Sequence, residues 1–252
     1  MSSDPTPPAS MEEDPGSDIE ALIQRLRLHQ PRPSPYAAGN PSAVVAPSPA
    51  AAGEQFRPRR AAVLVCLFRG GAGELRVLLT KRSSSLSTHS GEVALPGGKA
   101  EEGDADDAAT ALREAKEEIG LDSALVNVVA SLEHFFSKHL LVVVPVVGIL
   151  SDIQAFKPVL NVDEVDCIFD VPLEMFLKDE KRTSEEREWM GQKFTIHYFN
   201  YEKGSEKYVI WGLTAGILIH TASVVFQRPP DFPEQRVQFN LPKYSRECST
   251  MP

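Results

Sequence analysis

The sequence predicts an α+β fold in which a mixed β-sheet lies between helices. Segments with the composition of strands follow one another without a helix between each pair, which excludes a doubly wound parallel sheet. Segments with a helical pattern are few and lie late in the chain. With 252 residues, of which 42% are hydrophobic, the chain has enough apolar material for one sizeable core or two small ones.

Residues 1–58 have the composition of a disordered or loosely docked arm. Eleven of the 20 prolines lie there, interleaved with Ala, Ser and Gly, so the segment buries too little apolar surface to offset its ordering entropy. Within it, apolar residues at helical spacing follow a capping box formed by Ser17 and Glu20. We therefore expect a short helix near residues 18–28, either docked on the body or transient.

The first strands follow from Arg59 onward. The segments AAVLVCLF (61–68) and LRVLLTKR (75–82) flank a glycine-rich turn, and this pattern predicts a hairpin of largely buried strands. A short strand, GEVAL (91–95), comes next, and the Pro-Gly-Gly triplet at 96–98 ends it before the first helix of the body.

The second half of the chain begins with two apolar, β-branched segments, NVVASLEHFF (127–136) and LLVVVPVVGIL (140–150). Both predict strands. IFDVPLEMFL (168–177) has the pattern of a strand followed by a helix. KFTIHYFNYE (193–202) and KYVIW (207–211) predict a second hairpin.

Residues 209–226 are almost entirely apolar and reach the lower length limit for a membrane span. The segment follows soluble-looking strands and lacks flanking aromatic belts and a basic cluster. We therefore expect a buried core helix, and no membrane partner.

The charge balance bounds the partners of the chain. The net charge of −9, from 26 Lys and Arg against 35 Asp and Glu, argues against a broad nucleic-acid surface, so we expect no nucleic-acid partner. The three cysteines, Cys66, Cys167 and Cys248, form no CxxC pair, which indicates neither a zinc knuckle nor a disulfide framework. The N-terminal residues are acidic and proline-rich, without an apolar or Arg-rich targeting segment, so a cytoplasmic location is expected.

Residues 97–121 contain the first clear helix. Asp104 is the expected N-cap, the helix is expected over 105–119, and Gly120 stands where a left-handed C-cap belongs. One face of this helix is apolar, and the opposite side carries three carboxylates. Those carboxylates belong to Glu114, Glu117 and Glu118.

Three carboxylates at this spacing repel one another, and clustered oxygen ligands suit Mg²⁺ or Mn²⁺. The alternative is a solvated acidic face without a ligand. The glycines at 97 and 98 favour the metal site, because they let backbone approach closely and complete a metal or phosphate cradle.

The stretch REAKEEIGL (113–121) resembles the second half of the Nudix box, whose pattern is Gly, five residues, Glu, seven residues, then Arg-Glu-apolar-x-Glu-Glu-x-Gly-apolar. Counting back from Arg113, the first Glu of the pattern falls on Ala105 and the leading Gly on Lys99. One extra loop residue restores the register, with Gly98 as the leading Gly and Asp104 near the missing Glu.

Upstream, LLTKRSSSLSTHSGEVALPGGK (78–99) resembles the extended signature of the coenzyme A diphosphatase branch of Nudix hydrolases, including its plant members. The resemblance implies hydrolysis of CoA, and of CoA thioesters, to 3′,5′-ADP and 4′-phosphopantetheine. It also implies a Nudix hydrolase domain over 59–230 and a C-terminal tail over 231–252. ADP-ribose, NADH or an oxidised nucleotide is an alternative substrate, and a non-catalytic Nudix-like binding module is the alternative of another class.

Divalent ions held by the glutamates would neutralise a diphosphate and lower the pKa of an attacking water. The resemblance implies that Arg113, which is expected to face away from the carboxylates, orients the box loop and a glutamate through ion pairs. It places a base or further ligand in a late loop, where Glu164 lies beside Asp163 and Asp166. The expected Mg²⁺ or Mn²⁺ ligands are Glu114, Glu117, Glu118 and Gly98, and the expected catalytic residues are Glu117, Arg113 and Glu164.

The resemblance implies that the end of the second strand contacts phosphate or specifies CoA, which suits guanidinium forks and hydroxyls; the alternative is an ordinary polar strand end. The candidates are Lys81, Arg82, Ser83 and His89. The expected partner is a small-molecule substrate, CoA or a related nucleoside diphosphate derivative, and a homodimer is left open.

Overall fold

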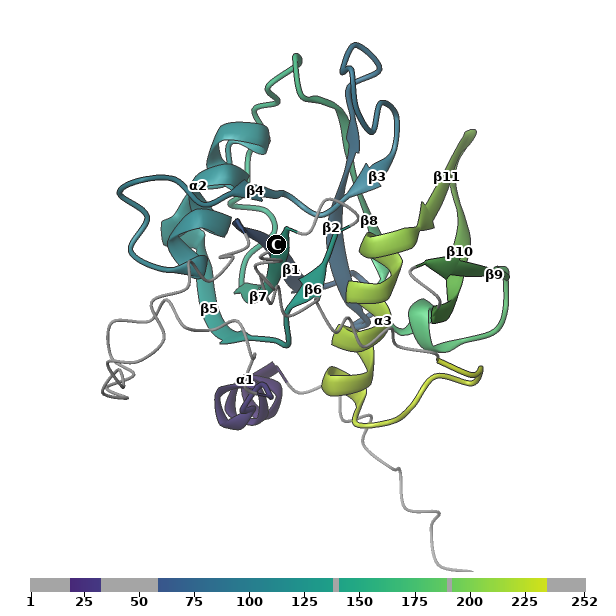
Figure 1. Cartoon of the computed structure of the whole chain (residues 1–252). Coiled ribbons are helices and arrows are strands. Elements are labelled where there is room, and N and C mark those ends of the chain that lie inside the picture. Colours follow the sequence, from purple (N-terminus) through teal and green to yellow (C-terminus); the bar gives the residue numbers. More distant parts are fainter. Residues whose placement is uncertain (1–18, 33–58, 138–140, 190–191, 235–252) are drawn as a thin grey trace, which may run out of the picture.

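The structure is a computed structural model that describes residues 19–32, 59–137, 141–189 and 192–234 (Figure 1). Predictions for other positions, including the Ser17 cap, Cys248 and most of the proposed arm and tail, lie outside these residues. Within them, the α+β class with a mixed sheet is confirmed.

The main sheet contains eight strands in the order β3-β2-β1-β7-β5, with β4 paired to β1, β6 to β7 and β8 to β2. β1 and β7 run parallel, and the other pairs are antiparallel, so the sheet is mixed. The strands are β1 (Arg60–Arg69), β2 (Leu75–Arg82), β3 (Val93–Ala94), β4 (Gly97–Lys99), β5 (Val126–Ser131), β6 (Phe135–Phe136), β7 (Val142–Leu150) and β8 (Val165–Pro172).

A second sheet of three antiparallel strands follows, in the order β11-β10-β9. The predicted hairpin forms β10 (Gln192–Lys203) and β11 (Glu206–Trp211). β9 (Arg182–Trp189) was not predicted. Its side chains are almost all exposed, so its sequence has none of the alternation that marks a half-buried strand.

The side chains of β1 alternate between two separate cores. Leu64 and Cys66 belong to the core beneath α2 (Asp107–Ile119), and Val65 and Leu67 belong to the core beneath α3 (Gly212–Phe226). Figure 1 shows these two helices on opposite sides of the main sheet. The sheet is thus covered on both faces, by one helix that carries charge and one that does not.

α3 is the buried helix expected from the apolar segment 209–226, although the first three of those residues belong to β11. Eight of its residues are buried. The described part of the chain contains no helix both long and apolar enough to span a bilayer. The strand-to-helix unit expected at 168–177 is β8 followed by the short 3₁₀ helix η2 (Leu173–Leu177). Another 3₁₀ turn, η1 (Ser123–Leu125), precedes β5.

The helix expected near residues 18–28 is α1 (Ile19–Leu28). Leu22, Ile23 and Leu26 are buried in the same core as α3. Nη2 of Arg25 donates a hydrogen bond of 3.2 Å to the carbonyl oxygen of Val225, so α1 packs against the C-terminal end of α3. This part of the proposed arm is therefore in contact with the body.

Candidate active site

The turn around β4 brings glycine backbone against α2. Gly97 has a φ of 152°, and its N–H donates to Oε2 of Glu118 at 3.2 Å. A Cβ atom at Gly98 would clash with the carboxylate of Glu114. The absence of a side chain at Gly98 therefore gives the Glu114 carboxylate its place beside the strand.

The three glutamates of α2 differ in their exposure. The side chain of Glu117 is 57% exposed and that of Glu114 is 15% exposed, whereas residue Glu118 is only 4% exposed. The carboxylates predicted on the side opposite the apolar face are therefore not equally accessible, because Glu118 is buried. The Glu118 carboxylate turns toward β4, where Gly97 donates a hydrogen bond to it. Helical spacing does not predict this, because it shows where a side chain lies around the helix axis but not which strand packs beside it.

The buried carboxylates interact unfavourably with one another. Burial raises the pKa of Glu118 to about 7, and the negative charges of Glu114 and Glu164 act in the same direction. Burial also raises the pKa of Glu114, against the attraction of the neighbouring Arg113. A divalent cation among these groups would relieve both the desolvation and the repulsion.

Arg113 ties α2 to the loop before it. Its Nε and Nη2 atoms each donate to a carboxylate oxygen of Asp104 at 3.0 Å, and this guanidinium holds the pKa of Asp104 well below its usual range. Its Nη1 atom lies 3.2 Å from Oε1 of Glu114 and 3.2 Å from Oε2 of Glu117. The prediction that Arg113 faces away from the carboxylates is wrong, because it lies between two of them.

The N-cap of α2 is Asp106, so the prediction of Asp104 is wrong. The Asp106 side chain accepts a hydrogen bond of 2.8 Å from the N–H three residues later. Asp104 does not cap the helix because Arg113 and two further donors bind its carboxylate. The C-cap is Gly120 with a φ of 70°, as predicted.

Glu164 lies in the loop before β8, in the same electrostatic cluster. Its Oε1 atom accepts from Nδ2 of Asn161 at 3.3 Å, and its carbonyl oxygen accepts from the N–H of Ser83 at 2.8 Å. Its charge is one of those that raise the pKa of the two more buried α2 glutamates. Its acidic neighbours, Asp163 and Asp166, are exposed.

Arg82 points toward the same cluster from the end of β2. Its positive charge lowers the pKa of Glu118, whereas burial is the larger effect and raises it. The Nε atom of Arg82 is buried and has no hydrogen-bond partner among the described residues. Ser83 is buried as well, and its hydroxyl lies 2.9 Å from that of Ser85. A partly buried guanidinium with an unused donor, beside a carboxylate cluster, is suited to bind an anion that a cation bridges to the carboxylates.

His89 stands apart from the carboxylates. It is exposed, has a φ of 56°, and pairs through Nδ1 with Oε2 of Glu92 at 2.9 Å. Lys81 also lies apart from them and lines a pocket with Glu92. The structure therefore brings Arg82 and Ser83 close to the glutamates, and places Lys81 and His89 on the neighbouring surface.

The donors of the cluster suit a hard divalent ion, since carboxylate and backbone oxygens are the ligands that Mg²⁺ and Mn²⁺ prefer. In the described segments, no three His, Cys, Asp or Glu side chains are already arranged around one metal position. Arg113 instead neutralises Glu114 and Glu117. The residues fit such an ion because their donor atoms are oxygens. A bound cation would also offset the burial and mutual repulsion of the carboxylates.

A comparison with family models identifies residues 58–191 as a NUDIX domain. Nudix hydrolase 15, mitochondrial, from Arabidopsis thaliana is 66% identical over 190 residues, which cover 75% of this chain and 67% of the relative. Nudix hydrolase 22, chloroplastic, from the same plant is 65% identical over 192 residues, which cover 76% of this chain and 63% of the relative. The matched region thus spans about two thirds of each plant relative.

A more distant relative comes from the mouse, Mus musculus. It is the peroxisomal coenzyme A diphosphatase NUDT7, which is 36% identical over 188 residues. The match covers 74% of this chain and 77% of the mouse protein. Together with the domain match, these sequence identities show to which family the chain belongs.

Proposed function

The chain belongs to the Nudix hydrolase family, and from that premise we propose that it hydrolyses the pyrophosphate bond of coenzyme A and its thioesters to 3′,5′-ADP and 4′-phosphopantetheine. Two observations support CoA as the substrate. The segment 78–99 resembles the signature of CoA diphosphatases, and one relative carries that activity in its name.

The observation that carries the proposal is an unpaired guanidinium beside converging carboxylates. The Nε atom of Arg82 is buried without a partner among the described residues, and its charge acts on Glu118. The negative charges of Glu114 and Glu164 also act on Glu118. A diphosphate needs this combination, since its oxygens accept from the guanidinium while divalent ions bridge them to the carboxylates.

Glu114, Glu117 and Glu118 would hold Mg²⁺ or Mn²⁺, with the carbonyl oxygen of Gly98 as a further ligand. When bound, the metal neutralises the diphosphate and lowers the pKa of a coordinated water. Arg113 positions two of the glutamates through its ion pairs.

Glu164 is proposed as the group that accepts the proton of the attacking water. Arg82 and Ser83 bind the diphosphate, and Lys81 and His89 bind more distant parts of the substrate.

Turnover of CoA, ADP-ribose and NADH, measured side by side with Mg²⁺ and with Mn²⁺, tests the substrate. We expect a strong preference for CoA. A preference for ADP-ribose, NADH or an oxidised nucleotide would assign the chain to another substrate class of the family. No turnover of any of them would favour a binding module.

The domain division is part of the proposal. We assign the activity to 59–230, with 1–58 as an arm and 231–252 as a tail. Deleting residues 1–18 should leave turnover unchanged. Deleting residues 1–32 also removes α1, which buries three apolar side chains, and should therefore lower the free energy of unfolding. Loss of turnover in the shorter deletion would contradict the division.

A cytoplasmic location is also proposed, because Cys66 and Cys167 are free thiols, which suits a reducing compartment. The names of the two plant relatives place those proteins in mitochondria and chloroplasts. A fluorescent protein fused to the C-terminus of the full chain tests the location, and an organellar signal would overturn it.

A further inference from the structure

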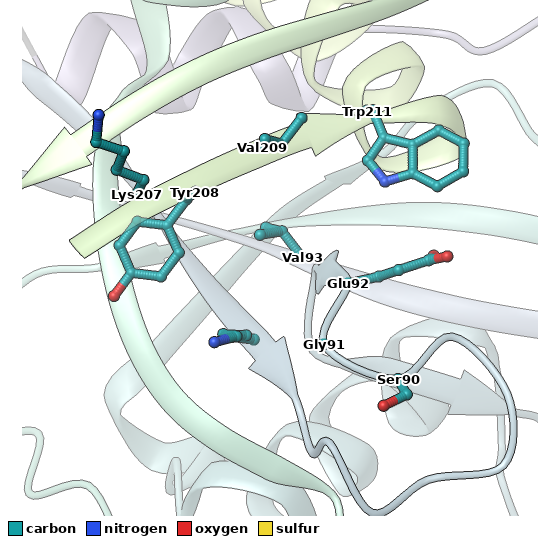
Figure 2. A pocket seen from close by; sticks show the side chains of 9 residues that line it. Ser90, Gly91, Glu92, Val93, Lys207, Tyr208, Val209 and Trp211 are labelled. Atoms are coloured by element: carbon teal, nitrogen blue, oxygen red, sulfur yellow. The ribbon is translucent and has the colours of Figure 1, made fainter.

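A pocket of about 240 Å³ lies between β11 and the chain segment that enters β3 (Figure 2). Lys207, Tyr208, Val209 and Trp211 line it from the second sheet, and residues 90–93 line it from the opposite side. The hydroxyl of Thr214, at the start of α3, donates to the carbonyl oxygen of Val93 at 3.2 Å, which joins the two walls. No role has yet been given to the β11 residues.

The pocket and the carboxylate cluster lie on opposite sides of β2. Leu78 packs in the core beneath α2, and Leu79 packs in the core beneath α3, as alternation along a strand requires. Lys81 continues the α3 side and lines the pocket, whereas the charge of Arg82 acts on Glu118 of α2. The end of β2 therefore separates two neighbouring binding regions, and one substrate can reach both by passing around it.

The positive charges of the pocket are available to a ligand. Among the described residues, the Lys81 side chain has no hydrogen-bond or ion-pair partner. Lys207 pairs with Glu202 at 3.2 Å, but both side chains are mostly exposed, so the pair contributes little and is readily exchanged. Lys81 and Lys207 both line the pocket, and their ammonium groups suit a dianionic group such as a phosphate monoester. The Glu92 carboxylate on the same pocket is paired with His89.

The aromatic side of the pocket is fixed in place. The indole of Trp211 stacks on the ring of Tyr198, with centroids 5.7 Å apart and an angle of 11° between the rings. The ring of Tyr208 stacks on Phe169 at 3.7 Å. Tyr208 is buried, whereas Trp211 is partly exposed, and a rigid aromatic ring that is partly open to solvent binds a planar base at low cost in entropy.

We propose that this pocket binds the nucleoside end of the substrate that carries a separate phosphate monoester, that is, the 3′-phosphoadenosine of CoA. Trp211 contacts the base, and Lys207 and Lys81 bind the 3′-phosphate. This inference rests on the proposed CoA activity. The volume is below the roughly 300 to 1,000 Å³ that is usual for a complete ligand, which suits one part of a substrate. The pantetheine end of CoA is uncharged, so the two lysines favour the end that carries the 3′-phosphate.

The test compares CoA with dephospho-CoA, which lacks only the 3′-phosphate. We expect K207A to raise KM for CoA about tenfold, the loss of one charge-assisted hydrogen bond, with kcat and the KM for dephospho-CoA unchanged. K193A is the matched control, since Lys193 lies on the second sheet in a similarly exposed ion pair with Glu186 and does not line the pocket. W211A should raise KM for both substrates, and W211F should restore it.

An equal rise of KM for the two substrates in K207A would assign Lys207 to a group that they share and overturn the inference. So would the same KM for CoA in K207A and K193A. Calorimetric binding of 3′,5′-ADP and of 5′-AMP needs no turnover and separates the pocket from the proposed function. K207A should weaken only 3′,5′-ADP; if it weakens neither or both, the pocket assignment is wrong, whereas absence of CoA turnover overturns the function.

Discussion

The two faces of the main sheet are covered by helices of opposite character. α3 carries no Asp, Glu, Lys or Arg and buries eight of its 15 residues, so its face contributes mainly apolar packing. α2 buries Ala111, Ala115 and Ile119 together with a carboxylate, that of Glu118. One face therefore stabilises the fold, and the other holds charges that oppose it.

Two glutamates make this difference quantitative. Glu133 lies on the α3 side, where its Oε2 atom is 2.6 Å from Nε2 of His220 and 3.2 Å from Nε2 of His29. Burial opposes its ionisation, but the hydrogen bonds from these histidines and the attraction of His220 outweigh it and lower the pKa of Glu133 to about 2. At Glu118 the N–H of Gly97 and the charge of Arg82 do not outweigh burial, which raises its pKa to about 7. Partners, more than burial itself, decide whether a buried carboxylate favours the folded state.

The largest effect is expected at the α2 glutamates. E118Q and E117Q should each reduce turnover by more than about 100-fold. Loss of a residue that only supports a metal ligand costs up to about 100-fold, and loss of the ligand itself should cost more. At pH 8 without metal, E118Q should also raise Tm by about 2 to 4 °C, because a buried negative charge is removed. E117Q is the control, since its side chain is 57% exposed and its Tm should not change. Turnover and calorimetric melting measure both effects, and a lower Tm in E118Q would break the comparison between the faces.

The α3 face should respond in the opposite way. Leu218 is fully buried on α3, so L218A should lower the free energy of unfolding by about 2 to 5 kcal/mol. The KM for CoA, and kcat per folded molecule, should stay unchanged, because α3 holds none of the metal-binding carboxylates. Urea unfolding and active-site titration check the two parts. A fall in kcat of the folded fraction would show that this face also shapes the chemistry.

The pH dependence of stability sharpens the comparison further. Because the folded pKa of Glu133 lies below its unfolded value of about 4.3, its contribution is complete above that pH and is lost as the pH falls toward 2. We expect E133Q to cost about 1.5 to 3 kcal/mol at pH 6 and about half as much at pH 3. Urea unfolding of both proteins at the two pH values measures this, and an equal difference at both would refute the assignment.

The smallest change in stability is expected at Gly98. A Cβ there meets only the far end of the Glu114 side chain, which can move aside, so G98A should change the free energy of unfolding by less than about 1 kcal/mol. Turnover should nevertheless fall roughly tenfold, because a carboxylate displaced by about 1 Å binds a metal poorly. Gly71 has no atom within 4 Å of its Cβ position, so G71A is the control and should change neither quantity.

The sequence predicted the α2 helix and its glutamates, but not how they are placed. Two aspartates precede the helix, and only the contacts of Asp104 with Arg113 and two further donors decide that Asp106 is the cap. The burial of Glu118 depends on β4, which the helical pattern does not contain. The hydrogen bond from Asn161 to Glu164 had no signal beyond proximity in the chain.

The pocket on β11 was missed for a related reason. Its walls come from residues 90–93 and from residues beyond 206, and nothing in the spacing of either segment indicates the other. Lys81 was singled out as a candidate from the sequence, yet its direction depends on β2 lying between two cores. Local patterns predict elements well, and the contacts between distant elements determine the site.

The parallel pairing of β1 with β7 has a consequence for how the protein folds. The two strands align from Arg60 opposite Val142 to Leu67 opposite Ile149, so their contact closes a long loop of chain. That loop contains β2, β4 and the whole of α2. Closing it is slow, because its entropy is lost before the contacts form. The helix can form early and by itself, but the carboxylates reach their final positions only when the two ends of the loop have met.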